Sequence, residues 1–506
     1  MKMVKSLLLG TAAGLVAMTG AQAADLPVKA KPVQYVKICS LYGAGFYYIP
    51  GTDMCLKVGG WVRQYMDYNA NSSLTSGPMI NNVNTRSTQN FVARVRGYIT
   101  ADARNQTEFG TLRSYIAVGL SATNTTGASN DAASGASGFS SNRAFIQIAG
   151  FTFGLSQSFY DFFPTPALSF FGGNIFASSD TSDGGKTVTA YTAQFGNGLS
   201  ATVSAEGVRA TSVYSGAGVI GSTAVAVAPA TFNAGSLAPT AARGAQMPDF
   251  VANLRLDQPW GSAQIMGAIH DVSGAYYGAS QDTGNPSNTL GWAVGAGLRI
   301  NAPQIGPGDY FDVQVNYAQG ASGYTNNAGG AYAFFKGGVG GSYGMGVITD
   351  GVYGGSVALG TATGVNLTTA WGVQAAYEHF WSKSWQTSLY GGYIATSYNT
   401  QANAILCAGE AAGGFTGAGA GAGSAAVAAA GCNNNNAQYI IGSRTQFNID
   451  SSTYLGVDIA YLGLKSGTMP AGTPVPASGA QPAGVRAIQD QNTWVGQFRI
   501  HRNFYP

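Results

Sequence analysis

Three histidines, His270, His379 and His501, are the residues that could act as a catalytic base or hold a metal ion, and they lie far apart in the chain. A hydrolase needs a nucleophile or an acid beside such a histidine. Asp271 follows His270 directly, at the outer end of a predicted strand. Adjacent strand residues point to opposite faces, so this pair is poorly arranged for proton transfer. The sequence therefore predicts that the protein is not an enzyme.

Two short segments imitate ligand-binding loops. Gly185-Lys186-Thr187 resembles the end of a phosphate-binding loop, but Asp180 stands where the pattern requires glycine, and the residues that follow alternate as a strand instead of opening a helix. Asp180 and Asp183 could belong to a calcium loop, but no glutamate follows at the spacing that supplies a bidentate ligand. We expect no cofactor and no metal, with a bound calcium ion as the alternative.

Five arginines are the strongest candidates for a functional site, because they fall on or near the polar faces of the first four predicted strands. They are Arg63, Arg94, Arg96, Arg113 and Arg143. Acidic residues that could face them across an opening are Asp161, Asp180 and Asp183. Rings of fixed charge decide which solutes and ions pass through a pore. Two interpretations stay open: opposed charges at a constriction, or an ordinary solvated wall.

The four cysteines fall into two local pairs, Cys39 with Cys55 and Cys407 with Cys432. An even, paired count in an exported protein predicts two disulfides. A metal site is the alternative, but the spacings are wide, no histidine lies near either pair, and no C-x-x-C motif occurs.

The N-terminus predicts export. Lys2 and Lys5 precede an apolar run at residues 7–16, and Ala21-Gln22-Ala23 gives the pattern of small residues at which a signal peptide is cleaved. The run is shorter than the ~20 residues of a spanning helix. We therefore expect a cleaved signal peptide at residues 1–23, a periplasmic-side segment at 24–54 and a single β-domain at 55–506.

The composition points to a protein whose outer surface faces lipid. Charged residues make up 9% of the chain, whereas soluble domains carry ~25%. The 25 basic and 22 acidic residues nearly balance, which gives no general reason to bind nucleic acid. So few charges on 506 residues would keep a globular protein in solution poorly.

Apolar and polar residues alternate again and again, most clearly in the last segment. One face there carries Trp494, Gly496, Phe498 and Ile500, and the other carries Gln497, Arg499, His501 and Asn503. Alternate strand residues point to opposite faces, so this strand has one apolar and one polar face. In a membrane barrel the apolar face meets lipid and the polar face lines water.

The connections alternate between short and long, as they do in membrane barrels. Predicted short turns include residues 102–108, 196–198 and 381–385, and predicted long loops include 162–185, 207–247, 320–363 and 397–436. The sequence therefore predicts an all-β, transmembrane antiparallel β-barrel of about 16 strands. We find no helical period, and the Ala/Gly stretch at 411–431 is expected to be a flexible loop.

Four long stretches resemble the general porins typical of alphaproteobacteria. They are CSLYGAGFYYIPGTDMCLKVGGWVR (39–63), FVARVRGYITADARNQTEFGTLRSYI (91–116), NRAFIQIAGFTFGLSQSFYDFF (142–163) and PDFVANLRLDQPWGSAQIMGAIHDV (248–272). The resemblance implies a homotrimeric, 16-stranded porin in the cell outer membrane, surrounded by lipid and lipopolysaccharide. It also implies a third outer loop, here about 161–185, that folds inward as a constriction, and passive diffusion of small hydrophilic solutes and ions.

The chain departs from this family at its end, where Tyr505-Pro506 follows the aromatic Phe504 that the assembly machinery would read. The loops at 207–247 and 320–363 are long and Gly/Ala-rich, and the resemblance implies little about their role. A substrate-selective channel on the same barrel, with a binding track of aromatic or charged side chains, is the alternative function.

Overall fold

The computed structural model describes the chain at residues 38–68, 82–84, 91–123, 140–162, 169–171, 181, 184–209, 212–216, 232–233, 236–237, 241–278, 280–325, 330–336, 342–409, 431–468, 474–475, 484–485 and 487–504. The predicted signal peptide at 1–23 and the stretch at 411–430 lie outside these residues. The chain divides into two compact units, Met1–Cys55 and Leu56–Pro506.

The described part of the first unit is closed by a disulfide between Cys39 and Cys55. It contains the short helix η1 (Ser40–Tyr42) and the strand β1 (Tyr47–Tyr48). The Cys39 N–H donates to the Phe46 carbonyl at 2.9 Å, and both cysteines are buried with Phe46.

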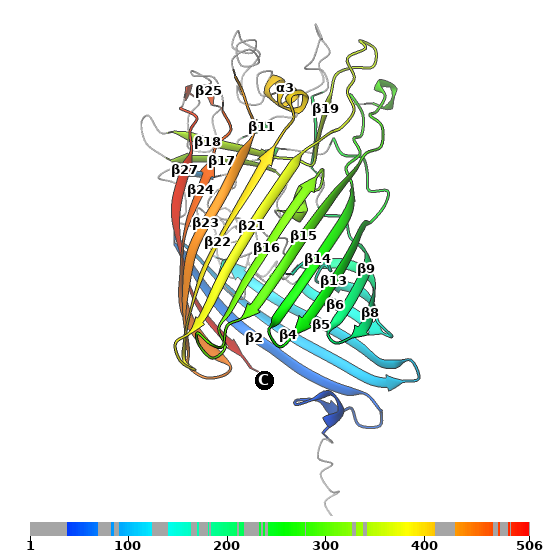
Figure 1. Cartoon of the computed structure of the whole chain (residues 1–506), viewed down its shortest axis with the longest axis vertical. Coiled ribbons are helices and arrows are strands. Elements are labelled where there is room, and N and C mark those ends of the chain that lie inside the picture. The colour runs from blue at the N-terminus through cyan, green and yellow to red at the C-terminus, as the bar shows by residue number, and fades with distance from the viewer. Residues whose placement is uncertain are drawn as a thin grey trace, which may run out of the picture. The chain divides into compact units, whose positions relative to one another are not determined.

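Sixteen strands close into one antiparallel barrel, as predicted (Figure 1). Each strand pairs with the next along the chain, and the last pairs with the first, so that Gln64 lies opposite Ile500. The strands are β2 (Cys55–Tyr68), β4 (Phe91–Thr107), β5 (Gly110–Thr123), β6 (Ser140–Ile148), β7 (Phe151–Ser156), β8 (Lys186–Gly196), β9 (Leu199–Glu206), β13 (Asp249–Gln258), β14 (Gly261–Asp271), β15 (Leu290–Asn301), β16 (Tyr310–Gln319), β21 (Thr369–Phe380), β22 (Trp385–Ser397), β23 (Asn436–Asn448), β24 (Thr453–Lys465) and β27 (Gln491–Asn503).

The alternation of side chains sets the two faces of the barrel. On β27, Trp494 is 60% exposed and Phe498 is 37% exposed, whereas Arg499 and His501 are 4% and 5% exposed. The apolar residues therefore point outward and the polar residues point into the barrel, as the sequence predicted. No helix in the described part of the chain is long and apolar enough to span a membrane.

Tight turns join the strands at one end, and long connections join them at the other (Figure 1). The turn between β8 and β9 has Asn197 at φ 50° and Gly198 at φ 75°, the backbone that a two-residue hairpin requires. The prediction of a turn at 102–108 is wrong, because β4 continues to Thr107. Asp102 accepts hydrogen bonds from Arg104 and from Arg113 on the paired strand, so these polar residues extend the hairpin.

Several short elements lie in the long connections, which take the outer side by the length rule for membrane barrels. The strands are β3 (Asn82–Asn84), β10 (Val213–Gly216), β11 (Phe232–Asn233), β12 (Ser236–Leu237), β17 (Gly330–Lys336), β18 (Tyr343–Ile348), β19 (Gly351–Gly354), β20 (Asn366–Leu367), β25 (Pro474–Val475) and β26 (Gly484–Val485). The helices are η4 (Gln281–Thr283), η5 (Ser322–Tyr324) and α3 (Thr400–Gly409).

The helix α3 contradicts the expectation that the chain has no helix. Asn399 caps its start, since the Asn399 Oδ1 accepts a hydrogen bond from the Ala402 N–H at 2.8 Å. Ile405 and Leu406 are fully buried, and the helix packs on β10 and β19. The helix is too short to give a clear period, but an asparagine before an alanine-rich run is a helix-start signal that the sequence contains.

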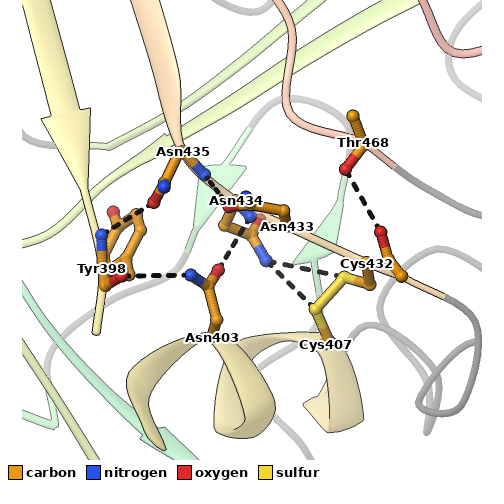
Figure 2. Close-up of a disulfide and its surroundings, with 9 residues drawn as sticks. Tyr398, Asn403, Cys407, Cys432, Asn433, Asn434, Asn435 and Thr468 are labelled. Carbon is orange, nitrogen blue, oxygen red and sulfur yellow. Dashed lines mark hydrogen bonds between the residues drawn. A yellow bond between two sulfur atoms is a disulfide. The ribbon is translucent and has the colours of Figure 1, made fainter. Parts of the chain in front are cut away.

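The second disulfide fixes the end of α3. Cys407 in its last turn is bonded to Cys432, and the Asn434 Nδ2 lies 3.6 Å and 3.8 Å from the two sulfur atoms (Figure 2). The Asn403 Oδ1 accepts a hydrogen bond from the Asn434 N–H at 2.8 Å. Both predicted cysteine pairs are thus confirmed as disulfides.

A closed barrel has every strand paired and no free edge, so it should resist detergent. We expect unheated protein to migrate differently from boiled protein on a detergent gel, and its circular dichroism to be dominated by β-structure. Identical migration of the two samples, or a helical spectrum, would contradict the barrel.

Candidate channel constriction

We name the connection between β7 and β8, residues 157–185, the constriction loop; its described residues, 157–162, 169–171, 181 and 184–185, lie inside the barrel. Its first part packs on the inner wall formed by β13, β14 and β15. The Asn253 Nδ2 donates to the Phe159 carbonyl at 2.6 Å. Phe162 fills the space above Gly297, where an added Cβ would collide with its ring. A side chain larger than hydrogen at Gly297 would therefore push the loop away from this wall.

The described tip of the constriction loop, residues 169–171, contacts a different part of the wall. The Asp458 Oδ2 on β24 accepts hydrogen bonds from the Phe170 N–H at 2.6 Å and from the Ser169 hydroxyl at 2.8 Å. The Phe170 carbonyl accepts a hydrogen bond from Arg499 on β27. Because β13–β15 and β24–β27 are separate parts of the barrel wall, the loop crosses the lumen. The predicted inward fold is confirmed.

Asp161 lies in the root of the constriction loop and is paired with a residue that the sequence analysis did not consider. Its carboxylate lies 3.0 Å from the Arg209 guanidinium, and both side chains are almost fully buried. It also accepts a hydrogen bond from the Thr181 N–H at 2.7 Å. These contacts hold the root of the loop in place. Asp180 and Asp183 lie outside the described residues, so an acidic side of the constriction remains a prediction.

Two of the predicted arginines meet on one wall. Arg63 on β2 and Arg96 on β4 donate to the Tyr65 hydroxyl at 3.2 Å and 3.5 Å. The Arg499 guanidinium lies 4.6 Å from the centre of the Tyr65 ring and 4.5 Å from that of Phe170. We name Arg63, Arg96 and Arg499 the arginine cluster. It lies on the wall that the loop tip contacts.

The sequence predicted that Arg499 lies on the polar face of the last strand, but it did not predict that Arg499 belongs to the arginine cluster. The cluster forms only when β27 closes on β2. The Arg63 Nε then donates to the His501 Nδ1 at 3.0 Å, across 438 residues of sequence. Neither strand carries a local signal for this neighbour.

The other predicted arginines have partners of their own. Arg113 forms an ion pair with Asp102 at 2.9 Å and donates to the Gln147 Oε1 at 3.1 Å. The Arg94 Nη2 lies 3.4 Å from the Ser121 hydroxyl, and the Arg143 Nη1 donates to the Asn142 carbonyl at 2.6 Å. The five residues therefore lie on one side of the barrel but do not form a single group.

Further inward-facing ion pairs were missed because they depend on the register between strands. Arg444 on β23 pairs with Glu378 on β21 at 2.7 Å, and its guanidinium lies 5.5 Å from the Phe170 ring. Arg299 on β15 pairs with Asp312 on β16 at 2.7 Å. Each pair joins two strands of the barrel, and a one-residue slip between strands would separate the partners.

The three histidines lie at separate places. His270 contacts Asp249 at 2.8 Å, and His379 contacts Asp309 at 2.7 Å in the turn between β15 and β16. Burial raises the pKa of Asp309, but hydrogen bonds from the Tyr377 hydroxyl, the Phe380 N–H and His379 outweigh it and leave the pKa below its ordinary value. Among the described residues, no group of three or more metal-binding side chains occurs.

Residues 25–497 match the family model of the Porin subfamily, which covers nearly the whole chain and the constriction described above. The chain belongs to the porin family.

Curated relatives agree with this assignment. The chain is 36% identical over 164 residues to a putative outer membrane protein, y4fJ, of Sinorhizobium fredii, which covers 31% of this chain and 43% of that protein. It is 35% identical over 210 residues to the porin Omp2b of Brucella suis, covering 40% and 52% of the two chains. A second Omp2b, from Brucella suis biovar 1, is 30% identical over 328 residues and covers 60% and 82%. The chain thus spans about half or less of the first two relatives.

Among solved structures, the outer membrane channel DcaP of Acinetobacter baumannii superposes with a TM-score of 0.56. The match covers 90% of this porin and 99% of that chain at 11% sequence identity, so it shows a shared fold alone. Together with the family, these matches identify the chain as an outer-membrane porin.

Proposed function

We propose that this porin forms a water-filled channel for passive diffusion of small hydrophilic solutes and ions, with a preference for anions. The arginine cluster beside the tip of the constriction loop is the observation that carries the proposal. Fixed charge at the narrow part of a pore favours ions of the opposite sign. The three guanidinium groups lie around one phenol, so a passing anion lowers their mutual repulsion.

The charge balance of this wall supports the same conclusion. The strands β2, β4 and β27 carry two acids, Asp67 and Asp102. Their inward-facing basic residues are Lys57, Arg63, Arg94, Arg96, Arg104 and Arg499. This excess of positive charge surrounds the point where the first and last strands meet.

A planar-bilayer recording under a KCl gradient tests this function. We expect discrete conductance steps, and a reversal potential whose sign reports a higher permeability to chloride than to potassium. The folded, heat-modifiable protein must be used, so that inactive material is not scored. Absence of conductance steps would overturn the channel, and a potassium-selective reversal potential would overturn the anion preference.

A substrate-selective channel is the second candidate, favoured by aromatic rings that stack inside the lumen. Trp61 lies 4.7 Å from Tyr98, and Tyr115 lies 5.3 Å from Phe145, measured between ring centres. The Arg113 guanidinium lies 5.1 Å from the Tyr115 ring. Such a row could bind solutes that combine a flat face with a negative charge. Concentration-dependent block of the current by one solute class, and not by others, would support this candidate.

A homotrimer in contact with lipid and lipopolysaccharide completes the proposal. Outward-facing aromatic pairs line the outer end of the barrel from β15 to β27, as in Trp371 with Tyr393 at 5.3 Å and Tyr461 with Trp494 at 5.0 Å. Such belts lie at the membrane interface. The outward positions towards the outer end of β5 and β9 carry aliphatic residues instead, such as Leu120 and Val203. That side is suited to pack against a second copy, and cross-linking of the folded protein would test for three subunits.

A further inference from the structure

We name the connection between β16 and β21, residues 320–368, the mouth loop; its described residues, 320–325, 330–336 and 342–368, have contacts on several sides of the barrel mouth. It contains η5, the hairpin of β17 and β18, and the short strands β19 and β20. In Figure 1, β17 and β18 run crosswise to the barrel strands near the end that carries the long connections. The mouth loop therefore crosses the direction of the barrel strands at this end of the barrel.

One part of the mouth loop is fixed to the connection between β9 and β13. There β19 pairs in parallel with β10, with Tyr353 opposite Ser215. The Asp350 carboxylate is fully buried and accepts hydrogen bonds from the Ser212 N–H and the Ser322 N–H, each at 2.7 Å. Asp350, which follows the hairpin, is thereby bonded to Ser322, which precedes the hairpin, and to Ser212 in the connection between β9 and β13.

The strand β18 contacts the outer ends of β23 and β24. The Val347 carbonyl accepts hydrogen bonds from the Asn436 Nδ2 at 2.8 Å and from the Tyr398 hydroxyl at 2.7 Å. An added Cβ at Gly344 would lie 3.2 Å from the Leu464 side chain. Leu464 is fully buried and lies six residues after Asp458, on the same face of β24. Since Asp458 faces the lumen, β18 lies inside the ring of strands.

The strand β17 reaches a third part of the rim. It pairs in parallel with β3, which belongs to the connection between β2 and β4, so that residue 335 lies opposite residue 83. The mouth loop therefore joins the connections after β9 and after β2 and also contacts β23 and β24. These parts of the rim are far apart in the strand order of the barrel. A segment held at all of them narrows the opening.

We propose that the mouth loop is a second selectivity element, which limits the size of the solutes that reach the constriction loop. Residues 320–368 contain two charged residues, Lys336 and Asp350, and the carboxylate of Asp350 is buried. The mouth loop thus selects by cross-section, and the arginine cluster below it selects by charge. This inference rests on the proposed channel function.

Removal of the β17–β18 hairpin tests the size limit. Residues 330–348 would be replaced by a short Gly/Ser linker, and folding would be checked by heat-modifiable migration. We expect single-channel conductance to rise by about 1.5-fold or more, and liposomes to swell faster in neutral sugars of increasing size, with the reversal potential unchanged. The comparison variant is Arg96→Ala, which should move the reversal potential, whereas the hairpin deletion should not.

A pair of cysteines tests the position of β18 independently of the deletion. Gly344→Cys with Leu464→Cys should form a disulfide that mass spectrometry of the digested protein detects, and the channel should still conduct. Gly344→Cys with Tyr461→Cys is the control, because Tyr461 lies on the outward face of β24. Absence of the Leu464 cross-link would overturn the placement of the mouth loop.

The two proposals fail in different ways. If the wild-type protein forms no pores, the channel function is wrong. If it forms pores and the folded deletion variant has the same conductance and the same size limit, the channel stands and the mouth loop is not a selectivity element.

Discussion

Replacing Asp458 by alanine should release the tip of the constriction loop and raise the single-channel conductance of the porin. This carboxylate accepts hydrogen bonds from the Ser169 hydroxyl, the Phe170 N–H and the Tyr390 hydroxyl. A buried donor left without an acceptor costs about 1–3 kcal/mol. The free-energy cost of leaving all these donors without Asp458 therefore exceeds the stabilisation that the remaining contacts of the short loop tip provide. We also expect more current noise, because a released loop fluctuates in the lumen. Bilayer recordings of the heat-modifiable variant would measure both quantities.

Two variants control for this effect. Asp458→Asn keeps an acceptor oxygen at the same place and should change the conductance much less. Asp312→Ala removes another inward carboxylate, one that pairs with Arg299. It should leave the constriction loop in place. If Asp458→Ala folds and conducts as the wild type does, the tip of the loop does not limit the current.

Arg96→Ala and Arg94→Ala should shift the ion selectivity toward cations with little loss of stability. Arg96 belongs to the arginine cluster, and Arg94 lies two residues away on the same face of β4. Removing either charge reduces the positive potential at the constriction. Charges are screened over about 30 Å at 0.01 M salt and about 3 Å at 1 M, so the shift should be largest at low KCl. The measurement is the reversal potential of each variant at low and high KCl.

Arg104→Ala is the matched control, because Arg104 lies on the same face of the same strand. Its guanidinium pairs with Asp102 at 2.7 Å, nearer the turn. We expect a smaller shift of the reversal potential for this variant than for Arg96→Ala. Equal shifts for the two variants at low salt would mean that the cluster is not the narrow part of the pore.

The barrel could be predicted from local pattern because its physical cause is local. Each strand needs one apolar and one polar face. Apolar and polar residues therefore alternate along the sequence, as in β27. The helix α3 was missed because its ten residues give too little periodicity, and its position depends on contacts with β10 and β19. The end of β4 was misplaced because its last residues are polar on both faces.

The candidate site was harder to predict because it depends on which strands become neighbours. The polar faces of β2 and β4 contain Arg63 and Arg96, and both side chains contact the Tyr65 hydroxyl. The contribution of Arg499 requires barrel closure, and the role of Asp458 requires the path of the constriction loop through the lumen. Asp161 was expected at the constriction, but its buried pairing with Arg209 depends on the loop after β9.

The pairing of β27 with β2 also determines when the arginine cluster forms during folding; we call the completed cluster the charge filter. Arg499 and His501 lie near the C-terminus and are synthesised last. They nevertheless contact Arg63 and Tyr65, which lie near the beginning of the chain. Contacts of such sequence separation form late, because the entropy of closing the intervening chain must be overcome first. An assembly intermediate that has not closed its seam therefore has no complete filter, and the sheet and the filter are finished in the same step. A chain that stops short of β27 loses both at once.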